Sequence, residues 1–149
     1  MTNSIRIAVV VALYGAVAGC GGGSGDGGNS PTAPSGGTPT VGATVTITAS
    51  GATPQQVRIQ QGEVVRFVNN DGVTHVPSSN PHPTHSDCPG VNSVGSLQPG
   101  GSGNTAAMNT ARSCGFHDHN NPDDTRFAGQ ILIGNAQAEP GPGYLIGGD

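Results

Sequence analysis

Short segments in which apolar and polar residues alternate constrain the fold of this chain most strongly. The stretch ATVTITA places Val45 and Ile47 on one face and threonines on the other, and QQVRIQ repeats the pattern with Val57 and Ile59. Turns rich in Gly, Pro and Asn separate such segments, and no segment keeps a helical period over three turns. The pattern therefore predicts an all-β sandwich or barrel over residues 41–135.

Further segments extend this pattern toward the C-terminus. EVVRFV predicts a strand over residues 63–68, and TARSCGF and GQILIG predict two more short strands. NNDG and SLQPGGSGN predict turns. The domain is poor in aromatic residues, and Phe67 and Phe116 are expected in its core. The tail over residues 136–149 is expected to be disordered.

The N-terminal region has the pattern of an export signal. An apolar run over residues 7–17 is short for a membrane span but typical of a signal-peptide core within residues 1–19. It ends in VAGC, which resembles the bacterial lipobox and implies that Cys20 is lipidated; the alternative is an ordinary signal peptide with an incidental cysteine. The Gly/Ser/Pro-rich stretch over residues 20–40 is predicted to be a flexible tether.

These features predict a lipoprotein anchored to the bacterial cell envelope, at the outer membrane, in the periplasm or on the cell surface. Gly21, rather than Asp, follows the lipobox cysteine, so retention at the inner membrane is not signalled. The membrane would be contacted through the lipid alone. The five basic residues are scattered arginines and the net charge is −4, which argues against a nucleic-acid partner.

Two cysteines remain once Cys20 is assigned to lipid. In the oxidising compartment that export implies, Cys88 and Cys114 are expected to form a disulfide. The alternative is that Cys114 is a thiolate metal ligand and that Cys88 stays free.

The histidines are confined to one part of the domain: His75, His82, His85, His117 and His119. Neutral imidazole is the commonest metal ligand, and copper and zinc favour it. His82 and His85 lie in a proline-stiffened loop, NPHPTHSDCPG, and the H-x-H pair would share one face of a strand. We therefore expect the five imidazoles to converge as metal ligands at one rim of the sandwich.

Three stretches resemble the cupredoxins, the plastocyanin- and azurin-like copper-binding proteins. VRIQQGEVVRFVNNDGVTHV resembles the start of a cupredoxin, LQPGGS is similar to the turn before the penultimate strand, and SCGFHDHNNPDDTRFAGQILI resembles the ligand loop with the final strand. The resemblance covers residues 44–133. It implies an all-β, cupredoxin-like Greek-key β-sandwich that binds copper, with His75 as the first copper ligand.

The chain departs from the family pattern at the other ligands. With Phe116 aligned as the core aromatic residue, Asp118 stands where the family has its copper-binding thiolate. Phe127 stands where many members have an axial methionine, and Gln130 is a weaker substitute for it. Aligning Cys114 as the thiolate instead gives Cys-x-x-His with His117.

Two metal sites are therefore predicted as alternatives. In the favoured one, a Cys88–Cys114 disulfide draws the proline-rich loop toward the last ligand strand. The ligands are then His75, His85, His117 and His119, with His82 as a fifth member. In the other, Cys114 binds copper with His75 and either His117 or His119. Asp87 and Asp118 are candidates for fixing imidazole tautomers, or are solvated rim residues.

The favoured function is copper binding at the cell envelope, in electron transfer with an unidentified redox partner protein or in copper handling. No Ser-His-Asp or paired-carboxylate arrangement stands out, so the chain is not expected to be an enzyme. The alternatives are a copper-dependent redox enzyme of superoxide dismutase type, and a zinc-binding or purely structural β-sandwich.

Overall fold

The computed structural model describes residues 37–140. The predicted signal peptide, lipidated Cys20, most of the tether and residues 141–149 of the tail lie outside the described residues. Within residues 37–140, no helix is long and apolar enough to cross a membrane.

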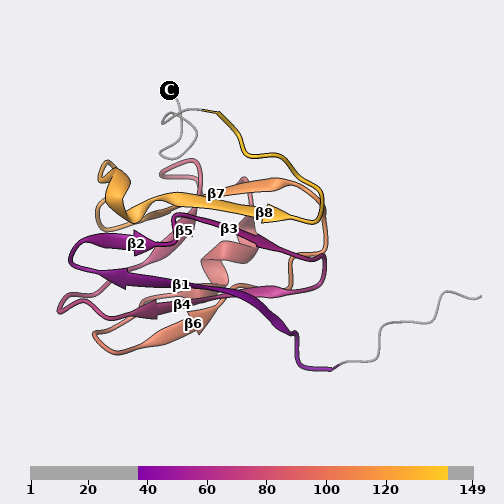
Figure 1. The fold of residues 1–149 in the computed structure, drawn as a ribbon. Helices are drawn as coiled ribbons and strands as arrows, with labels where there is room; N and C mark the ends of the chain where they lie inside the picture. The colour runs from indigo at the N-terminus through magenta and orange to yellow at the C-terminus, as the bar shows by residue number, and fades with distance from the viewer. Residues whose placement is uncertain (1–36, 141–149) are drawn as a thin grey trace, which may run out of the picture. The chain divides into compact units, whose positions relative to one another are not determined.

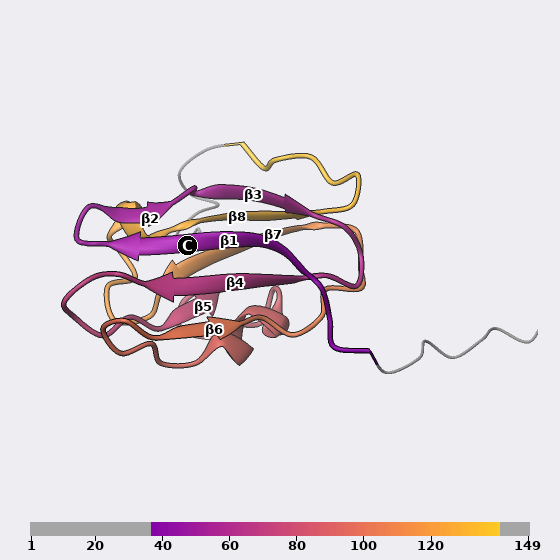
Figure 2. The same cartoon turned by 60° about the horizontal axis from the view of Figure 1, so that its bottom comes forward.

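The described residues form two four-stranded sheets that pack face to face (Figures 1 and 2). The first sheet has the strand order β2-β1-β4-β6, and the second has the order β3-β8-β7-β5. The strands are β1 (Val41–Thr48), β2 (Gly51–Thr53), β3 (Gln56–Ile59), β4 (Val64–Asn69), β5 (Pro77–Ser79), β6 (Ser102–Asn104), β7 (Ser113–Asp118) and β8 (Gly129–Ile133). Two short 3-10 helices, η1 (Pro89–Val94) and η2 (Thr125–Phe127), complete the set.

The alternating segments bury the predicted faces. Val45 and Ile47 on β1 are buried, and so are Val57 and Ile59 on β3. The rings of Phe67 on β4 and Phe116 on β7 meet edge to face across the core, with centroids 5.2 Å apart. The prediction of an all-β sandwich with these side chains in its core is confirmed.

The strand ends differ from the prediction where pairing partners could not be read from the sequence. The segment expected to end as a strand at residue 116 continues to Asp118, because β5 pairs with its last residues, from Ser79 opposite Phe116 to Pro77 opposite Asp118. The β5 sequence, PSS, shows no alternation, since all three of its residues are buried. His75 lies outside the strands and forms an isolated antiparallel bridge with Leu97.

A disulfide joins Cys88, just before η1, to Cys114 on β7. This confirms the predicted pairing and overturns the alternative in which Cys114 is a thiolate ligand. The link crosses 26 residues of sequence and ties the proline-rich loop to the strand that carries His117.

The described part of the predicted disordered tail is held against β8. The Gln130 side chain donates a hydrogen bond to the carbonyl of Glu139 and accepts one from its N–H, at 2.9 and 3.1 Å. The amide of Gln130 is therefore engaged with the backbone, and it does not act as the axial ligand considered for it.

Candidate metal centre

The loop over residues 80–88 carries two histidines over β7. Its base is closed by hydrogen bonds from the N–H of Asp87 to the carbonyl of Asn80, 2.9 Å, and from the N–H of Cys88 to the hydroxyl of Ser79, 2.7 Å. His85 has a φ of +50°, a left-handed conformation that is uncommon outside glycine and is often found at functional sites. The loop and the disulfide together bring its imidazoles to β7.

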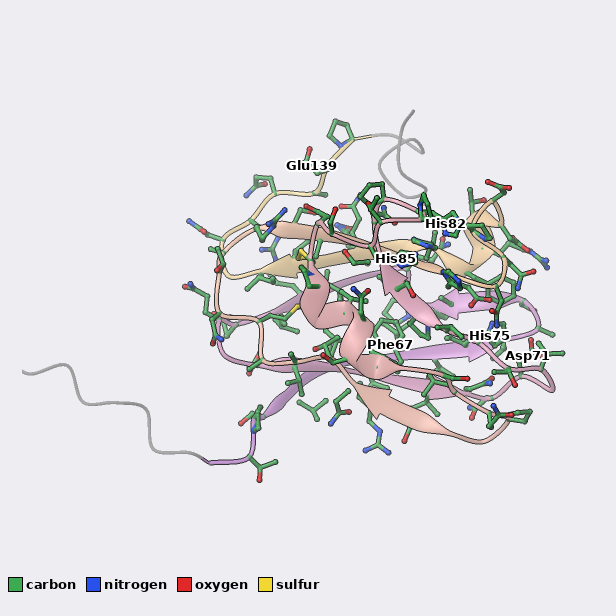
Figure 3. All side chains as sticks on the ribbon, turned by 180° about the vertical axis from the view of Figure 1, so that it is seen from behind. Phe67, Asp71, His75, His82, His85 and Glu139 are labelled. Atoms are coloured by element: carbon green, nitrogen blue, oxygen red, sulfur yellow. A yellow bond between two sulfur atoms is a disulfide. The ribbon has the colours of Figure 1, made fainter. Side chains whose placement is uncertain are left out.

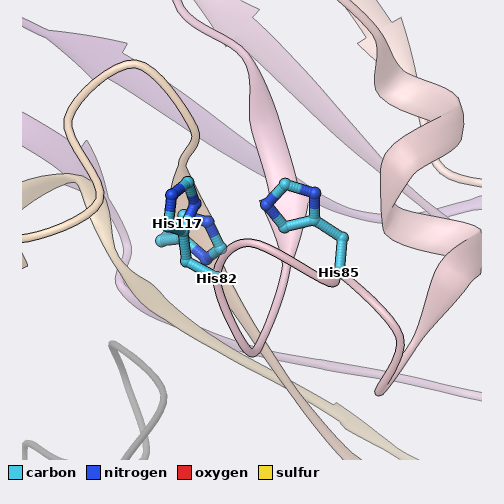
Figure 4. A group of neighbouring side chains, drawn as sticks. All are labelled: His82, His85 and His117. Atoms are coloured by element: carbon cyan, nitrogen blue, oxygen red, sulfur yellow. The ribbon is translucent and has the colours of Figure 1, made fainter.

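Three imidazoles converge where this loop meets β7 (Figure 4). One ring nitrogen from each of His82, His85 and His117 lies within 4.8 Å of the other two. The ring centroids are 5.4 Å apart for His82 and His85, 5.6 Å for His82 and His117, and 5.2 Å for His85 and His117. This is the spacing of ligands gathered around a single ion.

His117 presents a buried nitrogen with no hydrogen-bond partner. Its side chain is 1% exposed, and its Nδ1 lies 2.8 Å from the Oδ1 of Asn80, which accepts the Nδ1 proton. This hydrogen bond leaves a lone pair on Nε2, which is buried without a partner. Buried polar atoms are nearly always satisfied, so this nitrogen points to a ligand that completes it.

The electrostatics of the cluster keep His117 and His85 neutral at neutral pH. Burial, reinforced by the neighbouring rings of His85, His82 and His119, lowers the pKa of His117 to about 4. Burial also lowers the pKa of His85, with smaller contributions from His119 and His82. At neutral pH these rings therefore offer lone pairs rather than protons, which is the state that binds metal.

His119 lies at the solvent side of the same cluster. Its Nδ1 is 3.3 Å from Nε2 of His85, and its ring centroid is 4.9 Å from that of His85 and 5.2 Å from that of His82. Four of the five predicted ligands are thus neighbours.

His75, the fifth predicted ligand, is engaged elsewhere (Figure 3). Its Nδ1 and Nε2 are hydrogen-bonded to carboxylate oxygens of Asp118 and Asp71, at 2.9 and 3.0 Å, and its ring stacks on Phe127 with centroids 4.8 Å apart. Both ring nitrogens are therefore occupied, and the structure corrects the expectation that His75 joins the other four histidines.

The two carboxylates proposed to orient ligands have other partners. Burial alone would raise the pKa of Asp118, but hydrogen bonds from the N–H of Val76, from Asn121 and from His75 together hold it below its ordinary value. Asp118 thus serves His75 and not the cluster. Asp87 forms an ion pair with Arg112. Asn80 fixes the tautomer of His117 in the cluster. This role was not predicted from the sequence, in which the only feature that marks Asn80 is its position at the start of NPHPTH.

The two packed sheets define the fold as a cupredoxin-like β-sandwich, as predicted. A copper(I) form of an amicyanin variant is similar to this chain with a TM-score of 0.50 and 11% identity, over 64% of this chain and 82% of that one. The oxidised plastocyanin of Dryopteris crassirhizoma matches with a TM-score of 0.49 and 14% identity, over 61% of this chain and 99% of that one.

A purple cupredoxin from Nitrosopumilus maritimus matches with a TM-score of 0.47 and 18% identity, over 62% of this chain and 99% of that one. No protein-family model matches the sequence, and neither does any curated protein.

In this chain, the positions that resemble the family's ligands are engaged with one another. His75, Asp118 and Phe127 do come together, as the resemblance implies, but as a hydrogen-bonded and stacked group. The convergent imidazoles belong instead to the loop over residues 80–88 and to the outer face of β7, because His117 alternates with Phe116 and Asp118 along that strand.

Proposed function

We propose that this chain binds copper through His82, His85 and His117 and that it acts in copper handling. The observation that carries the proposal is Nε2 of His117, which is buried, unprotonated and without a partner beside two further imidazoles. Nitrogen ligands bind copper(II) more tightly than zinc(II) in otherwise equal sites, and zinc is the second candidate because imidazole suits both metals.

Copper handling is favoured over electron transfer by the ligand chemistry. Blue-copper electron carriers use a cysteine thiolate with two histidines, and the two cysteines of the described region are joined to each other. The enzyme alternative lacks support from a catalytic arrangement beside the cluster: the nearby carboxylates Asp118 and Asp87 are bound to His75 and Arg112.

The proposal includes the location inferred from the sequence. The VAGC motif supports a lipid anchor on Cys20 at the bacterial envelope, and a structural disulfide is typical of such an oxidising compartment. A protein placed there would take up or pass on copper outside the cytosol, through a partner of that compartment.

The test is to titrate the purified full chain with copper(II) sulfate and to measure bound copper after dialysis. We expect one copper per chain, with the weak ligand-field absorption of a nitrogen site and no intense thiolate band. The variant His82→Ala, at an exposed position, should lose most of the affinity.

The matched control is His75→Gln, which removes a histidine from the same domain but outside the cluster. It should keep one copper per chain wherever circular dichroism shows that it is folded. The proposal would be contradicted if the wild-type chain bound no copper. It would also be contradicted if folded His75→Gln lost copper binding while His82→Ala kept it.

A further inference from the structure

The position of His119 determines what kind of ion the cluster can hold. Resting on the proposed metal binding, we infer that His119 is a fourth ligand, and that the four imidazoles make a closed tetrahedral centre of the geometry that the d¹⁰ cations copper(I) and zinc(II) adopt.

The distance between His85 and His119 fits two ligands on one tetrahedral ion. Nitrogens bound at about 2.0–2.1 Å to the same tetrahedral ion lie about 3.3–3.4 Å apart, whereas adjacent square-planar ligands lie about 2.8–3.0 Å apart. Nε2 of His85 and Nδ1 of His119 are 3.3 Å apart. The hydrogen-bonded contact between these two nitrogens therefore already has the length expected between two ligands of one tetrahedral ion.

The ring positions give the same geometry independently. Imidazole centroids lie about 3.2 Å from a bound ion, so tetrahedral ligands have centroids about 5.2 Å apart. Square-planar ligands would instead give about 4.5 Å for neighbours and about 6.4 Å for opposite rings. Five of the six ring pairs among the four histidines, all but His117–His119, measure 4.9, 5.2, 5.2, 5.4 and 5.6 Å. These spacings exclude a square-planar arrangement of the rings, which is the one that copper(II) prefers.

The backbone places His119 for this role. Its N–H donates to the carbonyl of Val76 at 2.9 Å, so the strand pairing of β7 continues past its last residue. His117 and His119 are two residues apart on this extended segment and share its outer face. His119 is exposed, so its side chain can adjust to a bound ion without movement of the core.

A closed site has a functional consequence. Metal centres with four protein ligands hold their ion without an open position, whereas catalytic centres keep one for water or substrate. The centre in this chain would therefore store or transfer its ion and would not turn over a small substrate on it.

Cobalt(II) is the probe for this inference, because tetrahedral cobalt gives intense visible bands and higher coordination numbers give weak ones. The full chain should bind one cobalt with intense bands that added azide does not change. His119→Ala should still bind cobalt, but its bands should respond to azide at the vacated position. Its zinc(II) and copper(I) affinities should fall by about 10–100-fold, and its copper(II) affinity by less. The control Asn120→Ala, at the next exposed position, should behave as the wild type.

The outcomes separate this inference from the proposed function. If the wild type binds cobalt with weak bands, or if azide acts equally on the wild type and on His119→Ala, the fourth-ligand inference is overturned while copper binding stands. If the wild type binds none of cobalt, zinc and copper, both fail. Loss of copper(II) affinity equal to that of copper(I) in His119→Ala would overturn only the match of the centre to d¹⁰ cations.

Discussion

A single amide, that of Asn80, fixes the tautomer of His117, the most buried imidazole of the cluster. It accepts the Nδ1 proton of His117 and so leaves Nε2 to face the other imidazoles. An amide does this without adding charge, whereas a carboxylate would raise the affinity of the ring for a proton.

Replacing this amide should weaken metal binding without removing a ligand. In Asn80→Ala the His117 ring is free to rotate and to change tautomer, and we expect metal affinity to fall by about 10–100-fold. Asn80→Asp should keep the tautomer and retain more of the affinity at neutral pH. Competition titrations with a chelator of known affinity measure both. Equal affinity in the wild type and in folded Asn80→Ala would show that the amide has no positioning role.

The depressed pKa of His117 makes the metal-free protein sensitive to acid. The pKa is about 4 in the folded chain against an ordinary value of 6.5, so between these pH values the unfolded chain binds a proton that the folded chain does not. The free energy of unfolding should therefore fall as the pH drops from about 6.5 to 4, by about 3 kcal/mol in total from this residue. The lowered pKa of His85 acts in the same direction.

Urea unfolding of the metal-free protein at several pH values between 7 and 4 measures this loss. A folded His117→Gln variant should show a shallower dependence over the same interval. A wild-type stability that is flat across the interval would mean that His117 titrates normally in the folded protein.

At the scale of elements, the loop over residues 80–88 and β7 form one unit because a disulfide joins them. Closing a loop of 26 residues stabilises a fold by about 3–4 kcal/mol through the entropy of the unfolded chain. The same bond holds His82 and His85 beside His117, so it contributes to the site as well as to stability.

The double variant Cys88→Ala/Cys114→Ala should lose about 3–4 kcal/mol of unfolding free energy. Its metal affinity should also fall, because part of the binding energy is then spent on ordering the loop. Chemical denaturation measures the first effect and chelator competition the second, both under conditions where circular dichroism shows a folded protein. Unchanged metal affinity would mean that the hydrogen bonds at the base of the loop hold it unaided.

The sequence predicts these elements to different extents. β1 and β3 could be read directly, because each has one buried and one exposed face. β5 and β6 could not, since each has three residues and no alternation. The histidines were recognisable as a group, but the separation of His75 from the other four was not. It depends on the carboxylates of Asp118 and Asp71 and on the ring of Phe127, which the fold brings to His75.

For the whole molecule, we expect binding of an ion to be coupled to folding. The cluster is formed by side chains of a loop and a strand that a disulfide joins, so the unfolded chain has no equivalent site. Bound metal should therefore stabilise the folded state. At a free metal concentration a hundred times the dissociation constant the gain is about 2.7 kcal/mol. Thermal unfolding should shift upward with copper or zinc and return on addition of EDTA. His82→Ala should show little shift, and an equal shift in this variant would place the stabilising ion elsewhere.

The alternation of β7 also bears on how this chain can change in evolution. His117 faces the loop and Asp118 faces His75 on the opposite side, so the two polar centres are neighbours in sequence but back to back in space. Gain or loss of one residue in β7 would exchange these faces and put a carboxylate under the loop and an imidazole in the interior. The strand should therefore accept many substitutions but almost no change in length, and insertions or deletions among relatives should accumulate on either side of it.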